Sequence, residues 1–180
     1  MQKPMSPKKY ILSKAKELPF HECFISEDWK EKGLASIFVS KIMPSGNFII
    51  GVYLVDVFCL GLKNTLYQFN LTKTDYNEFY EKLDINENLI PCSLELAHNI
   101  IYGAIDYADE LGFSPNGDFN ITENILDDNL ISDGIDEIEF GKDGKPFYIA
   151  GPDDNIKKII ATLNRSVGET NYLYVHPKDY

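Results

Sequence analysis

An apolar, β-rich run near the start of the chain, interrupted by two short turns, limits the possible folds most. Residues 34–43 and 48–58 are rich in β-branched and aromatic side chains, and a Pro-Ser-Gly-Asn cluster at 44–47 separates them. Two such segments, joined by a short turn that contains glycine, predict a β-hairpin. A further turn at Gly61 leads into residues 62–71, so we expect a three-stranded antiparallel meander.

A long amphipathic helix is expected after the meander, at residues 94–111. Ser93 precedes it as a candidate N-cap, and Gly112 follows it as a candidate C-terminal stop. Apolar side chains recur at spacings of three and four, which places them on one buried stripe. The stripe consists of Leu94, Ala97, Ile101, Ala104, Ala108 and Leu111.

Shorter elements fill the rest of the chain. A second hairpin is expected at residues 136–150, with Asp143-Gly144 at its tip. The acidic stretch at 127–136 is expected to be a loop. Capping residues and apolar patterns predict the remaining elements. These are helices at 8–17, 74–83 (with Thr74 as N-cap), 119–126 and 155–163, and strands at 21–26 and 172–176.

The order of these elements favours a single α+β domain over residues 1–180, with residues 1–9 as a flexible end. Helices and hairpins are interspersed without the regular strand–helix–strand alternation of a parallel sheet. We therefore expect an antiparallel sheet, made of the meander and the C-terminal hairpin, packed by helices. A chain of 180 residues is long enough to bury a full core without disulfides or metals.

Charge and cysteine content limit the partners and the compartment. The net charge of −11 repels phosphate backbones, so nucleic acid is not an expected partner. The N-terminus lacks a secretory signal and no apolar run is long enough to cross a bilayer, which predicts a cytoplasmic protein without a membrane partner. The three cysteines form no CxxC or Cys/His cluster, so we expect neither disulfides nor a zinc site of the usual spacing.

Asp56 is chemically conspicuous because it interrupts the most apolar segment of the chain. In a straight strand it shares a face with Val52 and Leu54, where burying an unpaired carboxylate costs several kcal/mol. Three interpretations are open at this point. The strand ends near Asp56 and turn amides bind its carboxylate, Lys63 pairs with it, or it helps to hold a divalent cation.

Polar side chains recur at a spacing of four along one face of the long helix. They form either the solvated face of an amphipathic helix or one wall of a site. A cation held by Asp56 and helix carboxylates would serve metal-dependent hydrolysis, although no HExxH or other catalytic motif is present. No catalytic residue and no cofactor is assigned. The candidate polar site comprises Asp56, Lys63, His98, Tyr102, Asp106, Asp109 and Glu110.

Three stretches resemble an uncharacterised family of bacterial proteins: LVDVFCLGLKN at 54–64, ELGFSPNGDF at 110–119 and IEFGKDGKPFYIAGP at 138–152. The resemblance covers most of the chain, but it implies no activity and therefore no catalytic residues. It does imply a histidine near position 116, where this chain has Asn116 and so lacks that potential ligand. The pattern that the resemblance implies includes Asp56, Gly61, Lys63, Gly141, Lys142, Asp143, Gly144 and Pro146.

Two functional hypotheses follow. The first is a non-catalytic cytoplasmic domain that binds a protein partner, because the chain is acidic and carries no catalytic motif; it predicts an exposed apolar patch. The alternative is a metal-dependent hydrolase or nuclease-like enzyme that uses Asp56 with the helix carboxylates. That alternative requires these carboxylates to lie close enough to share a cation.

Overall fold

The apolar run at residues 34–71 builds the centre of the sheet. In the computed structural model, which describes residues 5–127 and 138–176, it forms strands β2 (Leu34–Ile42), β3 (Phe48–Asp56) and β4 (Gly61–Leu71). The strands pair antiparallel in chain order, with Leu34 opposite Asp56 in the β2–β3 register. The predicted meander is therefore confirmed.

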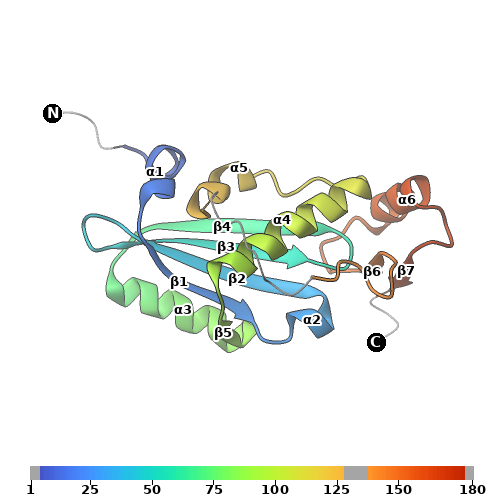
Figure 1. Cartoon of the computed structure of the whole chain (residues 1–180), viewed down its shortest axis with the longest axis horizontal. Helices are drawn as coiled ribbons and strands as arrows, with labels where there is room; N and C mark the ends of the chain where they lie inside the picture. The colour runs from blue at the N-terminus through green and yellow to red at the C-terminus, as the bar shows by residue number, and fades with distance from the viewer. Residues whose placement is uncertain (1–4, 128–137, 177–180) are drawn as a thin grey trace.

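Two further strands widen the sheet beyond β2. β1 (Phe20–Ser26) pairs antiparallel with β2, and β5 (Leu89–Pro91) pairs antiparallel with β1. The resulting order is β4-β3-β2-β1-β5, and the fold is a single α+β domain as predicted (Figure 1). The sequence predicts β1 but not β5, because three residues are too few to show an alternating pattern.

Alternate side chains of the strands supply the two faces of the sheet. Ile37 and Tyr53 point to the face covered by α4 (Leu94–Glu110), whereas Phe38 and Ile50 meet α3 (Lys73–Glu87) on the other face (Figure 1). α4 begins as predicted, because the Ser93 hydroxyl accepts a hydrogen bond from the Leu96 amide at 3.1 Å. The α4 face is thus buried, whereas Leu34 and Leu66 on the α3 face remain 39% and 41% exposed.

The shorter helices close the α4 side of the core and one end of the sheet. α1 (Pro7–Lys14) continues into a 3₁₀ turn (Ala15–Glu17), and α5 (Phe119–Thr122) into another (Glu123–Ile125). Both pairs pack into the core cluster beneath α4, while α2 (Trp29–Lys32) connects β1 to β2. No helix of residues 5–127 and 138–176 is long and apolar enough to cross a bilayer.

The N-cap of α3 differs from the prediction. Thr72, not Thr74, caps the helix, and its hydroxyl accepts a hydrogen bond from the Asp75 amide at 3.3 Å. The Asp75 carboxylate in turn accepts from the Thr72 amide at 3.2 Å, which completes a capping box. The reciprocal bonds explain why the N-cap lies two residues earlier than expected.

The predicted C-terminal hairpin is only partly present. Its tip is a tight turn, since Lys142 and Lys145 exchange backbone hydrogen bonds of 2.8 and 3.1 Å. However, β6 (Phe147–Ile149) does not pair back across that turn. It pairs parallel with β7 (Leu173–Val175), after α6 (Ile156–Ser166) has crossed between them.

This C-terminal unit, residues 147–175, packs on the turn between β3 and β4. Tyr148 and Leu163 form a separate buried cluster with Cys59 and Leu60 from that turn, and with Leu111 after α4. The unit lies at the end of the sheet where β3 finishes (Figure 1). The expected acidic loop lies outside the described residues, apart from Asp127 at its start.

Candidate functional site

Asp56 ends β3, and its carboxylate is bound by the turn that follows. Its Oδ1 accepts hydrogen bonds from the amides of Phe58 and Cys59, each at 2.9 Å. Only 7% of Asp56 is exposed, and this burial raises its pKa to about 6, against the pull of the turn amides and Lys63. The interpretation in which turn amides bind the carboxylate is therefore the one that the geometry supports.

Lys63 does not form the ion pair with Asp56 that the sequence allowed. Its Nζ lies 3.1 Å from Oδ1 of Asp154, a residue of the C-terminal unit. Asp154 also accepts hydrogen bonds from the Gly151 amide at 2.8 Å and from the Tyr148 hydroxyl at 3.0 Å. Burial opposes ionisation of Asp154, but these donors outweigh it and hold its pKa below the ordinary value.

A pocket of about 580 Å³ opens beside Asp56, and we call it the Asp56 pocket. Its wall includes side chains from residues 54–64, Asn116 and residues 149–152. The backbone amide of Asn116 donates a hydrogen bond to the Leu62 carbonyl at 3.0 Å, which links two segments of the wall. The pocket thus brings together segments that are far apart in the sequence.

The polar residues of α4 do not join this pocket. None of them is part of its lining, and Asp106, Asp109 and Glu110 are exposed on the helix surface. His98 instead packs against Tyr102, with ring centroids 4.4 Å apart and the rings tilted by 35°. Within residues 5–127 and 138–176, no three His, Cys, Asp or Glu side chains are grouped so that they could hold a metal ion.

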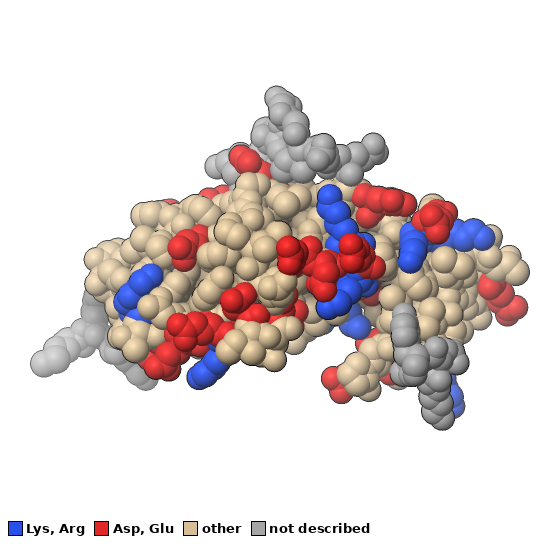
Figure 2. Space-filling view, turned by 90° about the horizontal axis from the view of Figure 1, so that it is seen from below, with Lys and Arg blue, Asp and Glu red and all other residues tan. Residues whose placement is uncertain are grey.

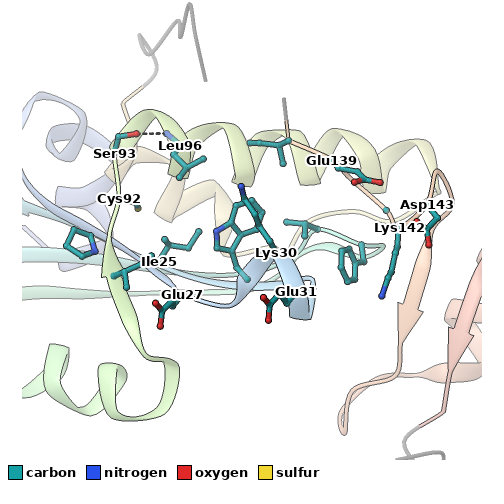
Figure 3. Close-up of a pocket in the computed structure, with 17 residues that line it drawn as sticks. Ile25, Glu27, Lys30, Glu31, Cys92, Ser93, Leu96, Glu139, Lys142 and Asp143 are labelled. Atoms are coloured by element: carbon teal, nitrogen blue, oxygen red, sulfur yellow. Dashed lines mark hydrogen bonds between the residues drawn. The ribbon is translucent and has the colours of Figure 1, made fainter. Parts of the chain in front are cut away.

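A larger groove, about 970 Å³ in volume, lies beside the edge strand, and we call it the β5 groove. It runs between α2, β5, the start of α4 and residues 138–143 (Figure 3). Apolar side chains form its floor, and acidic side chains stand at its margins. The Lys30 ammonium lies over the floor, 5.5 Å from the centroid of the Trp29 ring (Figure 3). The floor contains Ile25, Trp29, Val57, Phe58, Ile90, Cys92, Leu96 and Ile138.

The margins of the β5 groove are mainly acidic. Glu27 and Glu31 lie along one side, and Glu139 and Asp143 lie at the end nearest the Lys142 turn (Figure 3). Lys30 and Lys142 are the basic side chains in the lining. Acidic side chains also gather on the side that carries α3 and α2 (Figure 2). Acidic side chains therefore outnumber basic ones in the lining of the groove.

The outer edge of β5 is poorly suited to pairing with another strand. Alternate residues of β5 direct their backbone groups toward β1, as the bonds from the Glu27 amide to the Asn88 carbonyl and from the Cys92 amide to the Cys23 carbonyl show. Leu89 and Pro91 lie between these positions, so their backbone groups point outward. The Leu89 amide is already bound by the Asp84 carboxylate at 2.7 Å, and Pro91 has no amide hydrogen. Neither residue therefore offers a free amide hydrogen for pairing with another strand.

Sequence reasoning missed the β5 groove because its lining comes from separate segments. No motif marks Trp29, Ile90, Leu96 and Lys142 as neighbours, and β5 itself was not predicted. The only early signal was the single tryptophan inside a strongly charged stretch. No family model matches the chain, and comparisons with curated proteins and with solved structures find no match either.

Proposed function

We propose that the chain is a non-catalytic cytoplasmic domain that binds a protein partner, and that the β5 groove holds a basic peptide segment of that partner. The observation that carries this proposal is the combination of an apolar floor with a mainly acidic margin. Protein interfaces share this arrangement, with an apolar centre and a polar rim.

The size of the groove favours a peptide over a small metabolite. Its volume of about 970 Å³ lies at the upper end of the range of small-molecule pockets. Several apolar side chains of the floor are spread from β5 to the Lys142 turn, rather than gathered round one point (Figure 3). A peptide with two apolar anchors would cover this floor.

Charge selects the chemistry of the peptide. Glu27, Glu31, Glu139 and Asp143 are all exposed at the margin, where they would meet lysine or arginine side chains beside the apolar anchors. The overall charge of −11 adds a long-range attraction for such a partner. Affinity should therefore fall as the salt concentration rises, because exposed charges are screened.

Selection from a displayed library of random peptides tests the proposal. We expect enrichment of sequences that combine aromatic or aliphatic residues with lysine or arginine. The chain has one tryptophan, and since Trp29 lines the groove, its fluorescence reports binding of a synthesised winner. Titration then gives the dissociation constant at low and at high salt.

A matched pair of variants locates the binding site. Ile90→Lys places a positive charge in the groove floor, and we expect it to weaken peptide binding by about tenfold or more, which is about 1.4 kcal/mol. Ile85→Lys makes the same change on α3, at a residue 83% exposed and outside the groove, and should leave affinity unchanged. Equal effects of both variants, or no enrichment in the selection, would overturn the proposal.

A further inference from the structure

Cys23 and Cys92 face each other across two neighbouring strands. Cys23 lies in β1 and Cys92 directly follows β5. The β1–β5 register pairs Phe24 with Pro91, so the next residues outward, Cys23 and Cys92, are directly opposite. The Cys92 amide donates to the Cys23 carbonyl at 3.0 Å, and the two Sγ atoms are 3.3 Å apart.

This position suits a disulfide bond. Directly opposed residues of a hydrogen-bonded antiparallel pair have Cα atoms about 5.5 Å apart. Disulfides span Cα separations of roughly 4.4–6.8 Å, so the separation expected for this pair falls within the range that a disulfide can join. All three cysteines are free thiols in this structure, and a small rotation of two side chains would close the gap.

The two thiols have different environments. Cys92 is partly exposed and lies on the floor of the β5 groove, whereas Cys23 is 4% exposed (Figure 3). The hydrogen bond from Cys23 lowers the pKa of Cys92, and the same bond together with burial raises the pKa of Cys23. Cys92 is thus the more nucleophilic and more accessible thiol of the pair.

We propose that Cys23 and Cys92 form a reversible oxidation site, which a peroxide converts to an intramolecular disulfide. The Cys92 thiolate attacks one oxygen of hydrogen peroxide; a sulfur–oxygen bond forms and the oxygen–oxygen bond breaks. Hydroxide leaves and takes up the proton that the Cys92 thiol released, which gives water and a sulfenic acid at Cys92. Cys23 then loses its proton and attacks the Cys92 sulfur, which expels the second oxygen as water. Both sulfurs are oxidised, and the peroxide is reduced to water.

Cys59 provides an internal comparison. It is fully buried in the turn after β3, and burial raises its pKa. It packs with the C-terminal unit and does not line the groove. The structure therefore predicts that peroxide spares Cys59 under conditions that oxidise the other two thiols.

Counting free thiols in the full chain after hydrogen peroxide treatment, followed by unfolding, tests the proposal. Wild type has three cysteines, and we expect the count to fall from three to one. Peptide mapping should join the peptides that contain Cys23 and Cys92, and dithiothreitol should restore all three thiols. The oxidised form should melt several degrees higher, because the bond closes a long loop.

Three single variants separate the roles of the thiols. Cys59→Ser should still form the disulfide, whereas Cys92→Ser should form none. Cys23→Ser should leave a sulfenic acid at Cys92 that dimedone traps. Three remaining thiols in oxidised wild type, a bond to Cys59, or only intermolecular bonds would refute the proposal. This mapping needs no peptide ligand, so its result is independent of the proposed function.

Discussion

At the residue scale, backbone amides of the following turn hold the carboxylate of Asp56. Burial raises the pKa of Asp56 to about 6, and the hydrogen bonds from the turn amides keep this pKa from rising further. Asp56 stabilises the turn after β3, because its Oδ1 accepts hydrogen bonds from the Phe58 and Cys59 amides. This turn forms part of the Asp56 pocket. A role that is mainly structural follows from this geometry.

The raised pKa of Asp56 predicts a specific dependence of stability on pH. A folded pKa above the unfolded value contributes stability that is present below pH 4 and lost as pH rises through about 6. The shift corresponds to about 3 kcal/mol. Asp56→Asn should lack this loss, so its stability relative to wild type should rise between about pH 4 and pH 7.

Urea unfolding at a series of pH values measures this difference. Asp109→Asn is the control, because Asp109 is exposed on α4 and its replacement should leave the wild-type profile unchanged. A constant difference between Asp56→Asn and wild type across this pH range would contradict the raised pKa.

At the scale of elements, the turn between β3 and β4 is fitted closely against α4. Gly61 has a φ of 68°, and a Cβ added there would lie 2.8 Å from the Ala104 carbonyl oxygen and 2.7 Å from Cβ of Ala108. Only glycine combines this conformation with this contact. The same turn carries the amides that bind Asp56, so helix and site depend on one another.

Two glycine variants separate the contact from the conformation. Gly46 also has a positive φ, of 85°, but a Cβ there would meet nothing within 4 Å. Gly46→Ala should lower the free energy of unfolding by about 1 kcal/mol through strain alone. Gly61→Ala should lower it by about 3 kcal/mol, because overpacking against α4 is added. Equal losses in chemical denaturation would show that the contact with α4 is unimportant.

At the scale of the whole molecule, the ion pair between Asp154 and Lys63 links the C-terminal unit to the sheet. This ion pair is mostly buried, and the Gly151 and Tyr148 donors satisfy the same Asp154 carboxylate. Removing one partner of a buried pair leaves the other unpaired, which is more damaging than losing a surface ion pair.

Asp154→Asn should therefore destabilise the protein by about 2 kcal/mol near neutral pH. The loss should shrink as pH falls below the ordinary pKa of aspartate, because a lowered folded pKa gives stability that acid removes. Hydrogen exchange should quicken in β6, α6 and β7 before it does in β2 and β3. Asp153, the exposed neighbour, gives the control. If Asp153→Asn has the same effect, the stabilisation does not come from the Asp154–Lys63 ion pair.

Local signals in the sequence determined the central sheet and the main helix. The meander, the Ser93 cap and the buried stripe of α4 depend on periodicity and capping, which act within a few residues. For Asp56, local reasoning left three interpretations open, and the geometry supports the one in which the strand ends there and turn amides bind the carboxylate.

The tertiary structure alone decided which distant segments meet. The partner of Lys63, the parallel pairing of β6 with β7, and the strand β5 all depend on contacts across long stretches of chain. The β5 groove and the facing thiols of Cys23 and Cys92 arise in the same way. Periodicity specifies which face of an element is apolar but not which other element covers it, so the fold determined these sites.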